Sequence, residues 1–329
     1  MPTRPAYPPL DPEAGPLWRS ALDTFFGGEV VLTHDNLDLL RTANSLAAEA
    51  LLTSHGFEEQ EVTVPGPGGP LTASIFTPVS AVTAGGTRPG IYWIHGGGMV
   101  AGDRYQAVEA ILLGEAIGGV VMSIEYRFAP EHPSPASGDD CYAGLAWFLE
   151  HAADFGVDPA AVFVGGASAG GGLAAGTALH LRDSGGASLA GLILCCPMLD
   201  DRMTSVSSRQ FQNDIVWTRP SNEFGWSALL GERYGTDDVT IYEAPGRATD
   251  LSGLPPTLID VGSVDLFRDE DVAFASAIWA AGGDAELHVW PGGYHGFEMF
   301  APESVLSKVA LETRRQWILR RVAHLGLVR

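Results

Sequence analysis

Short apolar segments alternate with helical segments through most of the chain, and this alternation constrains the fold more than any other feature. Nearly continuous apolar strands separated by helices are typical of a parallel sheet that is covered on both faces. Two further strand-like runs around a Pro/Gly turn precede them, within residues 61–79. We therefore predict an α/β fold with a mostly parallel eight-stranded sheet flanked by helices. The six strands predicted after the turn are residues 90–95, 118–126, 161–166, 191–197, 256–262 and 285–290.

Two regions fall outside this alternation. Residues 1–56 read as helical, with Leu39, Ala43, Leu46 and Ala50 on one apolar stripe. Residues ~200–250 contain aromatic and polar helical pieces without a strand-like run, and insertions of this length often form lids or binding elements. We expect an N-terminal helical cap segment (1–56) and a catalytic domain (57–329) with a cap insertion around 200–250. A peripheral excursion without a role at the site is the alternative for the insertion.

The charge and cysteine content limit the partners and the compartment. The 329 residues carry a formal net charge of −21, with 40 acidic and 19 basic side chains. Such a surface repels nucleic acid and anionic lipid, so we expect neither as a partner. The three cysteines, Cys141, Cys195 and Cys196, do not suggest a disulfide framework. The proline-rich start lacks the apolar core of a signal peptide, and no segment reaches the ~20 apolar residues of a membrane span. We expect a reduced, cytoplasmic protein, and a homodimer is possible.

Ser168 lies in Gly166-Ala167-Ser168-Ala169-Gly170, a G-x-S-x-G motif between a predicted strand and a small-residue helix. This is the context of a nucleophile elbow, where a serine on a sharp turn needs small neighbours. A phosphate-binding loop fits less well, because no Lys-Ser/Thr pair follows the glycines. A dinucleotide site would require its glycines near the first strand. We predict that Ser168 is a nucleophile.

A nucleophilic serine needs a base and an orienting acid, which follow it in the order Ser, Asp, His in an α/β hydrolase. His295 lies in a Gly-rich loop just past the last predicted strand, so we predict it as the base. Asp265 lies in the loop directly after the preceding strand, so we predict it as the acid. The less suitable candidates are His180, His288, His324, Asp260, Asp269 and Asp271.

A third motif, His95-Gly96-Gly97-Gly98, ends an earlier predicted strand. Bare glycine N–H groups there can approach a substrate oxygen, as in the HGGG-type oxyanion loop of lipases and esterases. A flexible turn without a role is the alternative. No metal-ligand spacing such as H-E-x-x-H appears, so we expect no metal.

The motifs together resemble the hormone-sensitive-lipase-like esterases, the bacterial family IV carboxylesterases. The resemblance rests on HGGGMVAGD, YRFAPEHPSPA, GGASAGG, DLSGLPPTLIDVGSVDLFRDE and YHGFE, and it covers roughly residues 60–320. It implies the α/β-hydrolase fold with a helical cap and a Ser168–Asp265–His295 triad. It also implies an oxyanion hole formed by Gly97, Gly98 and Ala169, with His95 in a structural role. Members of this family typically hydrolyse short- to medium-chain acyl esters without a cofactor.

The chain departs from the family at Ala167, where Asp or Thr is usual, at Leu266 and Phe267 of VDLF, where Pro-Leu usually follows the acid, and at Ser134. None of these positions carries a reacting group. The leading hypothesis is a serine carboxylesterase that acts through an acyl-enzyme on a small-molecule ester. The alternatives are amide or carbamate hydrolysis or acyl transfer by the same triad, and a non-catalytic ligand-binding receptor. Candidate pocket aromatics are Phe25, Trp217, Phe224 and Trp226.

Overall fold

The computed structural model of this chain describes residues 6–26, 31–38, 41, 56–79, 87–213 and 215–326, with the backbone alone for 21–26. The strands are β1 (Phe57–Gly66), β2 (Gly69–Pro78), β3 (Arg88–Ile94), β4 (Val120–Ile124), β5 (Val157–Ala167), β6 (Gly191–Cys195), β7 (Thr257–Val264) and β8 (Ala285–Tyr294). The α-helices are α1 (Gly15–Phe26), α3 (Val108–Ile117), α4 (Ala136–Glu150), α5 (Ala169–Asp183), α6 (Val206–Gln210), α7 (Arg219–Leu230), α8 (Arg268–Ala280), α9 (Phe297–Phe300) and α10 (Val305–His324). Short 3-10 helices are η1 (Ala152–Phe155), η2 (Gly231–Arg233) and η3 (Pro245–Arg247).

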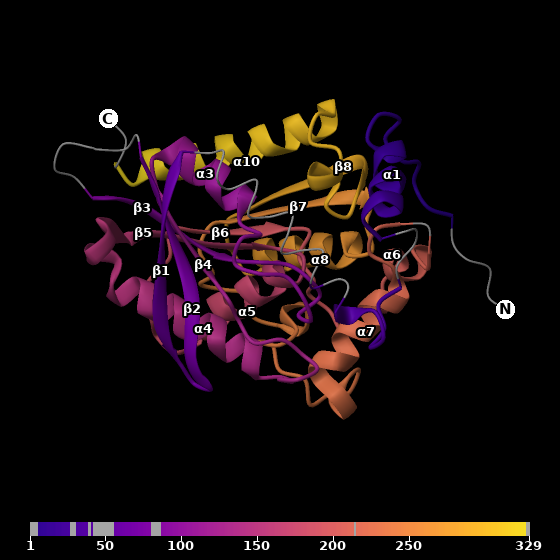
Figure 1. The fold of residues 1–329 in the computed structure, drawn as a ribbon, viewed down its shortest axis with the longest axis horizontal. Coiled ribbons are helices and arrows are strands. Elements are labelled where there is room, and N and C mark those ends of the chain that lie inside the picture. Colours follow the sequence, from indigo (N-terminus) through magenta and orange to yellow (C-terminus); the bar gives the residue numbers. More distant parts are fainter. Residues whose placement is uncertain are drawn as a thin grey trace.

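The strands form one eight-stranded sheet in the order β1-β2-β4-β3-β5-β6-β7-β8. β2 runs antiparallel to both of its neighbours, and all pairs from β4 to β8 are parallel. Each predicted strand lies in this sheet, and the predicted mostly parallel α/β fold is confirmed. Because parallel strands begin on the same side, the loops after β5, β7 and β8 meet at one edge (Figure 1).

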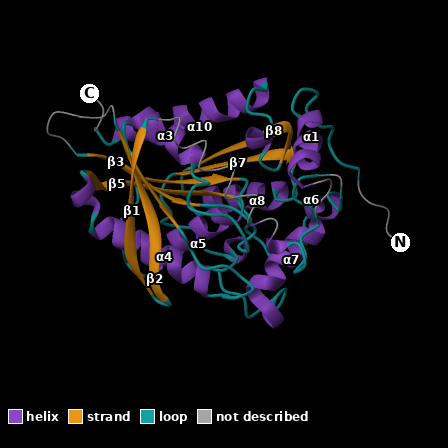
Figure 2. Cartoon of the chain, in the orientation of Figure 1, coloured by secondary structure: helices purple, strands orange, loops and turns teal. Residues whose placement is uncertain are grey.

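Helices cover both faces of the sheet, which explains why its strands are apolar along their whole length (Figure 2). Tyr92 and Ile94 of β3 join a core with residues of α4, α5 and α8. Ile91 and Trp93 point to the opposite face and pack with residues of α3 and α10. Cys195 lies in this second core, and all three cysteines are buried and free.

The region 200–250 contains α6, α7, η2 and η3, and no strand occurs among its described residues. α1, α6 and α7 gather at the side of the sheet where β7 and β8 end (Figure 1). The N–H of Leu32 donates to the Ser221 hydroxyl on α7 over 3.2 Å, and the His34 ring packs edge-on against Phe224. The N-terminal segment therefore contacts the insertion directly.

Of the predicted apolar stripe in the N-terminal segment, all four residues (Leu39, Ala43, Leu46 and Ala50) lie outside the described residues. Within the described ranges, none of the helices combines the length and the apolar content that a membrane crossing requires.

Candidate active site

Ser168 occupies a sharp turn between β5 and α5, with φ 58° and ψ −123°. A non-glycine residue at positive φ stores backbone strain of about 1–3 kcal/mol, so its surroundings must hold it. They do so with two hydrogen bonds: the Ser168 N–H donates to Cys195 O over 2.8 Å, and Met198 N–H donates to Ser168 O over 2.9 Å. The backbone of the turn is thus fixed by the segment that follows β6.

The glycines on either side of Ser168 allow the turn to pack against the neighbouring strand. A Cβ at Gly170 would overlap the carbonyl oxygens of Ile94 and His95, and one at Gly166 would overlap the carbonyl of Gly170. Any larger residue would force α5 away from the end of β3. The glycine content around the serine is therefore a packing requirement of the elbow.

The structure brings Ser168, His295 and Asp265 together from the ends of three strands. The Ser168 hydroxyl lies 2.9 Å from Nε2 of His295, and His295 Nδ1 lies 2.9 Å from Oδ2 of Asp265. Asp265 is fully buried, His295 is 8% exposed, and Ser168 is half-buried. The Phe267 N–H donates to the other carboxylate oxygen of Asp265 over 3.0 Å, which fixes the carboxylate plane.

The alternative acids have other partners or none. Asp260 lies within β7 and accepts from Trp290 and Arg314. Asp269 pairs with Arg268 at the start of α8. Asp271 is buried, and neither of its carboxylate oxygens has a partner within the described part of the chain. Asp265 is therefore the acid among the candidates that reaches the imidazole.

The alternative histidines have separate environments. His180 on α5 is stacked between the rings of Tyr142 and Tyr242, whose centroids lie 4.0 and 4.9 Å from its own. His288 lies in β8 and contacts Glu286 over 2.9 Å, and His324 is the last residue of α10. The prediction of His295 from chain order thus agrees with the geometry.

The glycine loop after β3 approaches the elbow closely. A Cβ added to Gly96 would lie 3.0 Å from Ala167 O and 3.4 Å from the Ser168 Cβ. Gly97 and Gly98 have φ of +110° and +64°, which turn the loop in a conformation that L side chains rarely adopt. In the described part of the chain, no backbone carbonyl accepts from the N–H of either glycine.

The Ala169 N–H lies at the first position of α5, where a helix leaves its N–H groups unpaired. Such groups and the helix dipole favour a developing negative charge. The loop glycines and Ala169 therefore offer unpaired donors on two segments that meet beside Ser168.

The side chain of His95 holds the glycine loop in place through contacts with Gly96 and Tyr126. Its ring is fully buried, stacks on Tyr126 at 4.3 Å and contacts the carbonyl of Gly96 over 2.8 Å through Nδ1. Because a carbonyl only accepts, Nδ1 carries the proton. Burial lowers the pKa of His95 to about 4, so the ring is neutral near pH 7.

Tyr126 and Arg41 support the same loop, and the sequence reasoning missed both. The Tyr126 hydroxyl donates to His95 O over 3.1 Å. Arg41 donates to Val100 O over 2.8 Å and forms a two-pronged ion pair with Glu131. Tyr126 and Glu131 lie in the YRFAPEHP segment, so that motif was the available signal for a supporting role. The N-terminal segment therefore reaches the glycine loop through Arg41.

Trp217 is the candidate pocket aromatic that reaches the site. Its ring centroid lies 6.2 Å from that of His295, and a Cβ at Gly98 would come within 2.5 Å of its Cη2 atom. Trp226 is fully buried in the core, and Phe224 packs against His34. The side chain of Phe25 lies outside the described residues.

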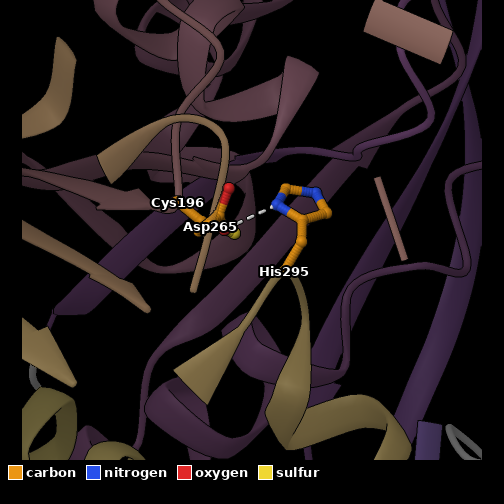
Figure 3. A group of neighbouring side chains, drawn as sticks. All are labelled: Cys196, Asp265 and His295. Carbon is orange, nitrogen blue, oxygen red and sulfur yellow. Dashed lines mark hydrogen bonds and ion pairs between the residues drawn. The ribbon is translucent and has the colours of Figure 1, made fainter. Parts of the chain in front are cut away.

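Cys196, Asp265 and His295 form the cluster drawn in Figure 3, with potential ligand atoms within 4.8 Å of one another. A metal would require the thiolate and the free Nδ1 electron pair. Burial raises the pKa of Cys196 well above its ordinary value, so the thiol keeps its proton. Nδ1 of His295 is occupied by its hydrogen bond to Asp265. The donor set suits a hydrogen-bonded pair better than a metal ion.

Comparisons with known proteins show the family to which this fold belongs. A family model described as alpha/beta hydrolase fold matches residues 91–299. The carboxylic ester hydrolase LipN of Mycobacterium tuberculosis is 35% identical over 244 residues, which are 72% of this chain and 63% of that relative. The matched part is thus less than two thirds of LipN.

Solved structures match over more of the chain. A structure titled bacterial heroin esterase has a TM-score of 0.82 at 34% identity, and the match covers 95% of this chain and 98% of the other. Esterase LipW from Mycobacterium marinum has a TM-score of 0.83 at 27% identity, covering 96% and 98%.

Proposed function

The chain belongs to the α/β-hydrolase family, in its hormone-sensitive-lipase-like branch, and from this premise we propose that it is a serine carboxylesterase. The observation that carries the proposal is the pair of 2.9 Å contacts that join Ser168, His295 and Asp265. The relatives whose names specify ester hydrolysis support the same reaction. The proposed substrate is a small ester with a short- to medium-chain acyl group.

In the proposed acylation step, the Ser168 oxygen forms a bond to the ester carbonyl carbon and its proton passes to Nε2 of His295. Asp265 holds Nδ1–H, so that Nε2 is free to accept that proton. Backbone N–H groups of Gly97, Gly98 and Ala169 would donate to the oxyanion. When the carbon–oxygen bond to the alcohol breaks, His295 returns the proton to the leaving oxygen.

Deacylation repeats the sequence with water. His295 takes a proton from the water as its oxygen bonds to the acyl carbon, and the Ser168 oxygen leaves with the proton. The products are a carboxylic acid and the free enzyme, so no external oxidant or cofactor is required. Amide or carbamate hydrolysis and acyl transfer need the same groups, and the choice depends on the leaving group and the acceptor.

We also propose that the N-terminal segment and the insertion form the cap of this site. The contacts from Leu32 and His34 to α7, and the position of Trp217 beside Gly98 and His295, support this assignment. A purely ligand-binding role is less well supported, because the three reacting groups are present and in contact.

The proposal is tested by labelling with a fluorophosphonate and by hydrolysis of p-nitrophenyl acetate, butyrate and octanoate. We expect one adduct on Ser168, and loss of both labelling and hydrolysis in Ser168→Ala. Ser184→Ala, which changes an exposed serine at the other end of α5, is the matched control. Labelling at another residue, or full hydrolysis by Ser168→Ala, would refute the mechanism.

A further inference from the structure

A buried ionic cluster of Asp260, Glu298 and Arg314 lies behind the proposed triad. Arg314 on α10 donates through Nε to Asp260 Oδ2 on β7 over 2.9 Å, and through Nη2 to Glu298 on α9. The exposed fractions of the three side chains are 3% for Arg314, 1% for Asp260 and 7% for Glu298. Trp290 of β8 donates to the same Asp260 oxygen over 2.9 Å. The guanidinium therefore joins α10 to β7 and α9, and the Trp290 bond to Asp260 adds β8.

The cluster is connected to the elements that carry Asp265 and His295. Asp260 and Asp265 belong to the same strand and the loop that leaves it, and Glu298 follows His295 by three residues. The cluster side chains lie close to Tyr294 and Gly296, the two neighbours of His295 in the chain. Only Gly296 and Phe297 separate Glu298 from His295 in the chain, so the position of Glu298 constrains the backbone that carries the imidazole.

The segment that carries Glu298 cannot hold its own position. α9 has four residues, and a helix of one turn is not stable without tertiary contacts. Gly296, between His295 and α9, has φ +65° and can act as a pivot. Phe297 is buried while Met299 is 66% exposed, so one face of this turn meets solvent. The ion pair from Glu298 to Arg314 is the charged tether of this turn to α10.

A contribution to fold stability does not by itself explain why this ion pair is buried. Removing charges from water costs about as much as a buried ion pair returns, and apolar side chains of similar volume often stabilise a fold better. The cluster also has two carboxylates for one guanidinium, and a third carboxyl, that of Glu109 on α3, interacts with all three of these charges. Buried charged networks can instead specify one geometry, and catalysis tolerates little error in the position of a base.

We propose that Arg314 and Glu298 are positioning residues for His295: their buried ion pair holds α9 so that the imidazole remains between Ser168 and Asp265. This inference rests on the proposed ester hydrolysis for its kinetic readout. Neither residue touches the reacting atoms.

Glu298→Met is the decisive variant, because it cuts the tether and leaves Arg314 paired one-to-one with Asp260. We expect kcat for p-nitrophenyl acetate to fall about 10- to 100-fold, the range for a catalytic group displaced by up to ~1 Å. KM should change little, whereas the melting temperature should fall, because Nη2 of Arg314 loses its buried acceptor. Glu298→Gln retains an acceptor for Arg314 but loses the charge, so its kcat should fall only a few-fold below that of the unmodified enzyme. Glu312→Met, the same substitution at a half-exposed ion pair on α10, should match the unmodified enzyme.

The far-downfield proton signal of His295 Nδ1–H in NMR spectra supplies a readout that needs no substrate. We expect it to broaden or shift in Glu298→Met and to persist in Glu312→Met. If Glu298→Met fails to fold, the test rests on Glu298→Gln. A few-fold lower kcat together with a broadened His295 Nδ1–H signal supports the inference, and a kcat and a signal equal to those of the unmodified enzyme overturn it. Unchanged kcat and signal in folded Glu298→Met would also overturn it. If the unmodified protein hydrolyses no ester, the proposed function is refuted, and the NMR comparison still tests the positioning of His295.

Discussion

The buried His95 should lower the free energy of unfolding as the pH falls, and His95→Phe should remove this contribution. In the folded protein burial lowers the pKa of His95 from 6.5 to about 4, and its Nε2 atom has no partner among the described residues. The unfolded chain therefore binds a proton more readily than the folded one between these pH values. Stability from the neutral ring is present above pH 6.5 and is lost as the pH falls towards 4.

The magnitude follows from linkage. A depression of about 2.5 pKa units corresponds to roughly 3 kcal/mol lost once the pH is well below 4, and to about 2 kcal/mol at pH 5. Phenylalanine preserves the stacking on Tyr126 but removes the hydrogen bond to Gly96 O, a pH-independent loss of about 1 kcal/mol. His95→Phe should thus be less stable at pH 8, equal near about pH 6, and about 1 kcal/mol more stable at pH 5.

Urea unfolding followed by tryptophan fluorescence at pH 8, 6 and 5 measures the difference. Other buried acids also titrate in this range, but they are common to both proteins and cancel in the comparison. His288→Phe, which changes a partly exposed histidine of β8, is the control and should show no crossover. A constant stability difference between His95→Phe and the unmodified protein at all three pH values would refute the reasoning.

Two further substitutions test local features. In Gly98→Ala the new Cβ would lie 2.5 Å from Trp217 Cη2, so we expect kcat/KM for p-nitrophenyl acetate to fall about 100-fold or more, as when an oxyanion donor is misplaced. Gly282→Ala has a similar positive φ, +80°, with no atom within 4 Å of the new Cβ, and should retain full activity; equal activity of the two variants would contradict the clash. Asp271→Ala removes a buried carboxyl whose pKa burial raises well above its ordinary value, and should stabilise the fold by about 1–3 kcal/mol at pH 8. Because the raised pKa of Asp271 costs stability as the pH increases, the stability gained in Asp271→Ala should shrink towards pH 4. Urea unfolding measures this gain, and Asp284→Ala, at an exposed position, is the control. A gain no larger than that of Asp284→Ala would contradict a destabilising role for the Asp271 carboxyl.

Local chemistry and chain order were sufficient to predict the sheet and the three proposed reacting residues. Apolar runs of strand length and glycines at tight turns are properties of neighbouring residues, so Ser168 could be located before any tertiary contact was known. Asp265 and His295 could be selected because loops after parallel strands must lie at one edge of the sheet. The motif resemblance then limited the reaction to acyl transfer chemistry.

Contacts between distant segments could not be predicted in this way. Trp217 was one of four candidate aromatics, and its position over Gly98 became clear only from the packing of the insertion. The support of the glycine loop by Tyr126 and Arg41 likewise joins residues far apart in the chain. Ala167, one of the departures from the family pattern, is half-buried beside the second core, and its small side chain fits that environment.

The sequence by itself determined the class of fold, the elbow serine and the order of the proposed triad, because these depend on residue type and spacing. The tertiary structure decided which acid meets the imidazole, what anchors the glycine loop, and which charges lie behind His295. The physical reason is that burial and pairing are set jointly by residues from several elements. Asp260 and Asp265 are five positions apart on one strand and its loop, yet one faces Arg314 and the other His295.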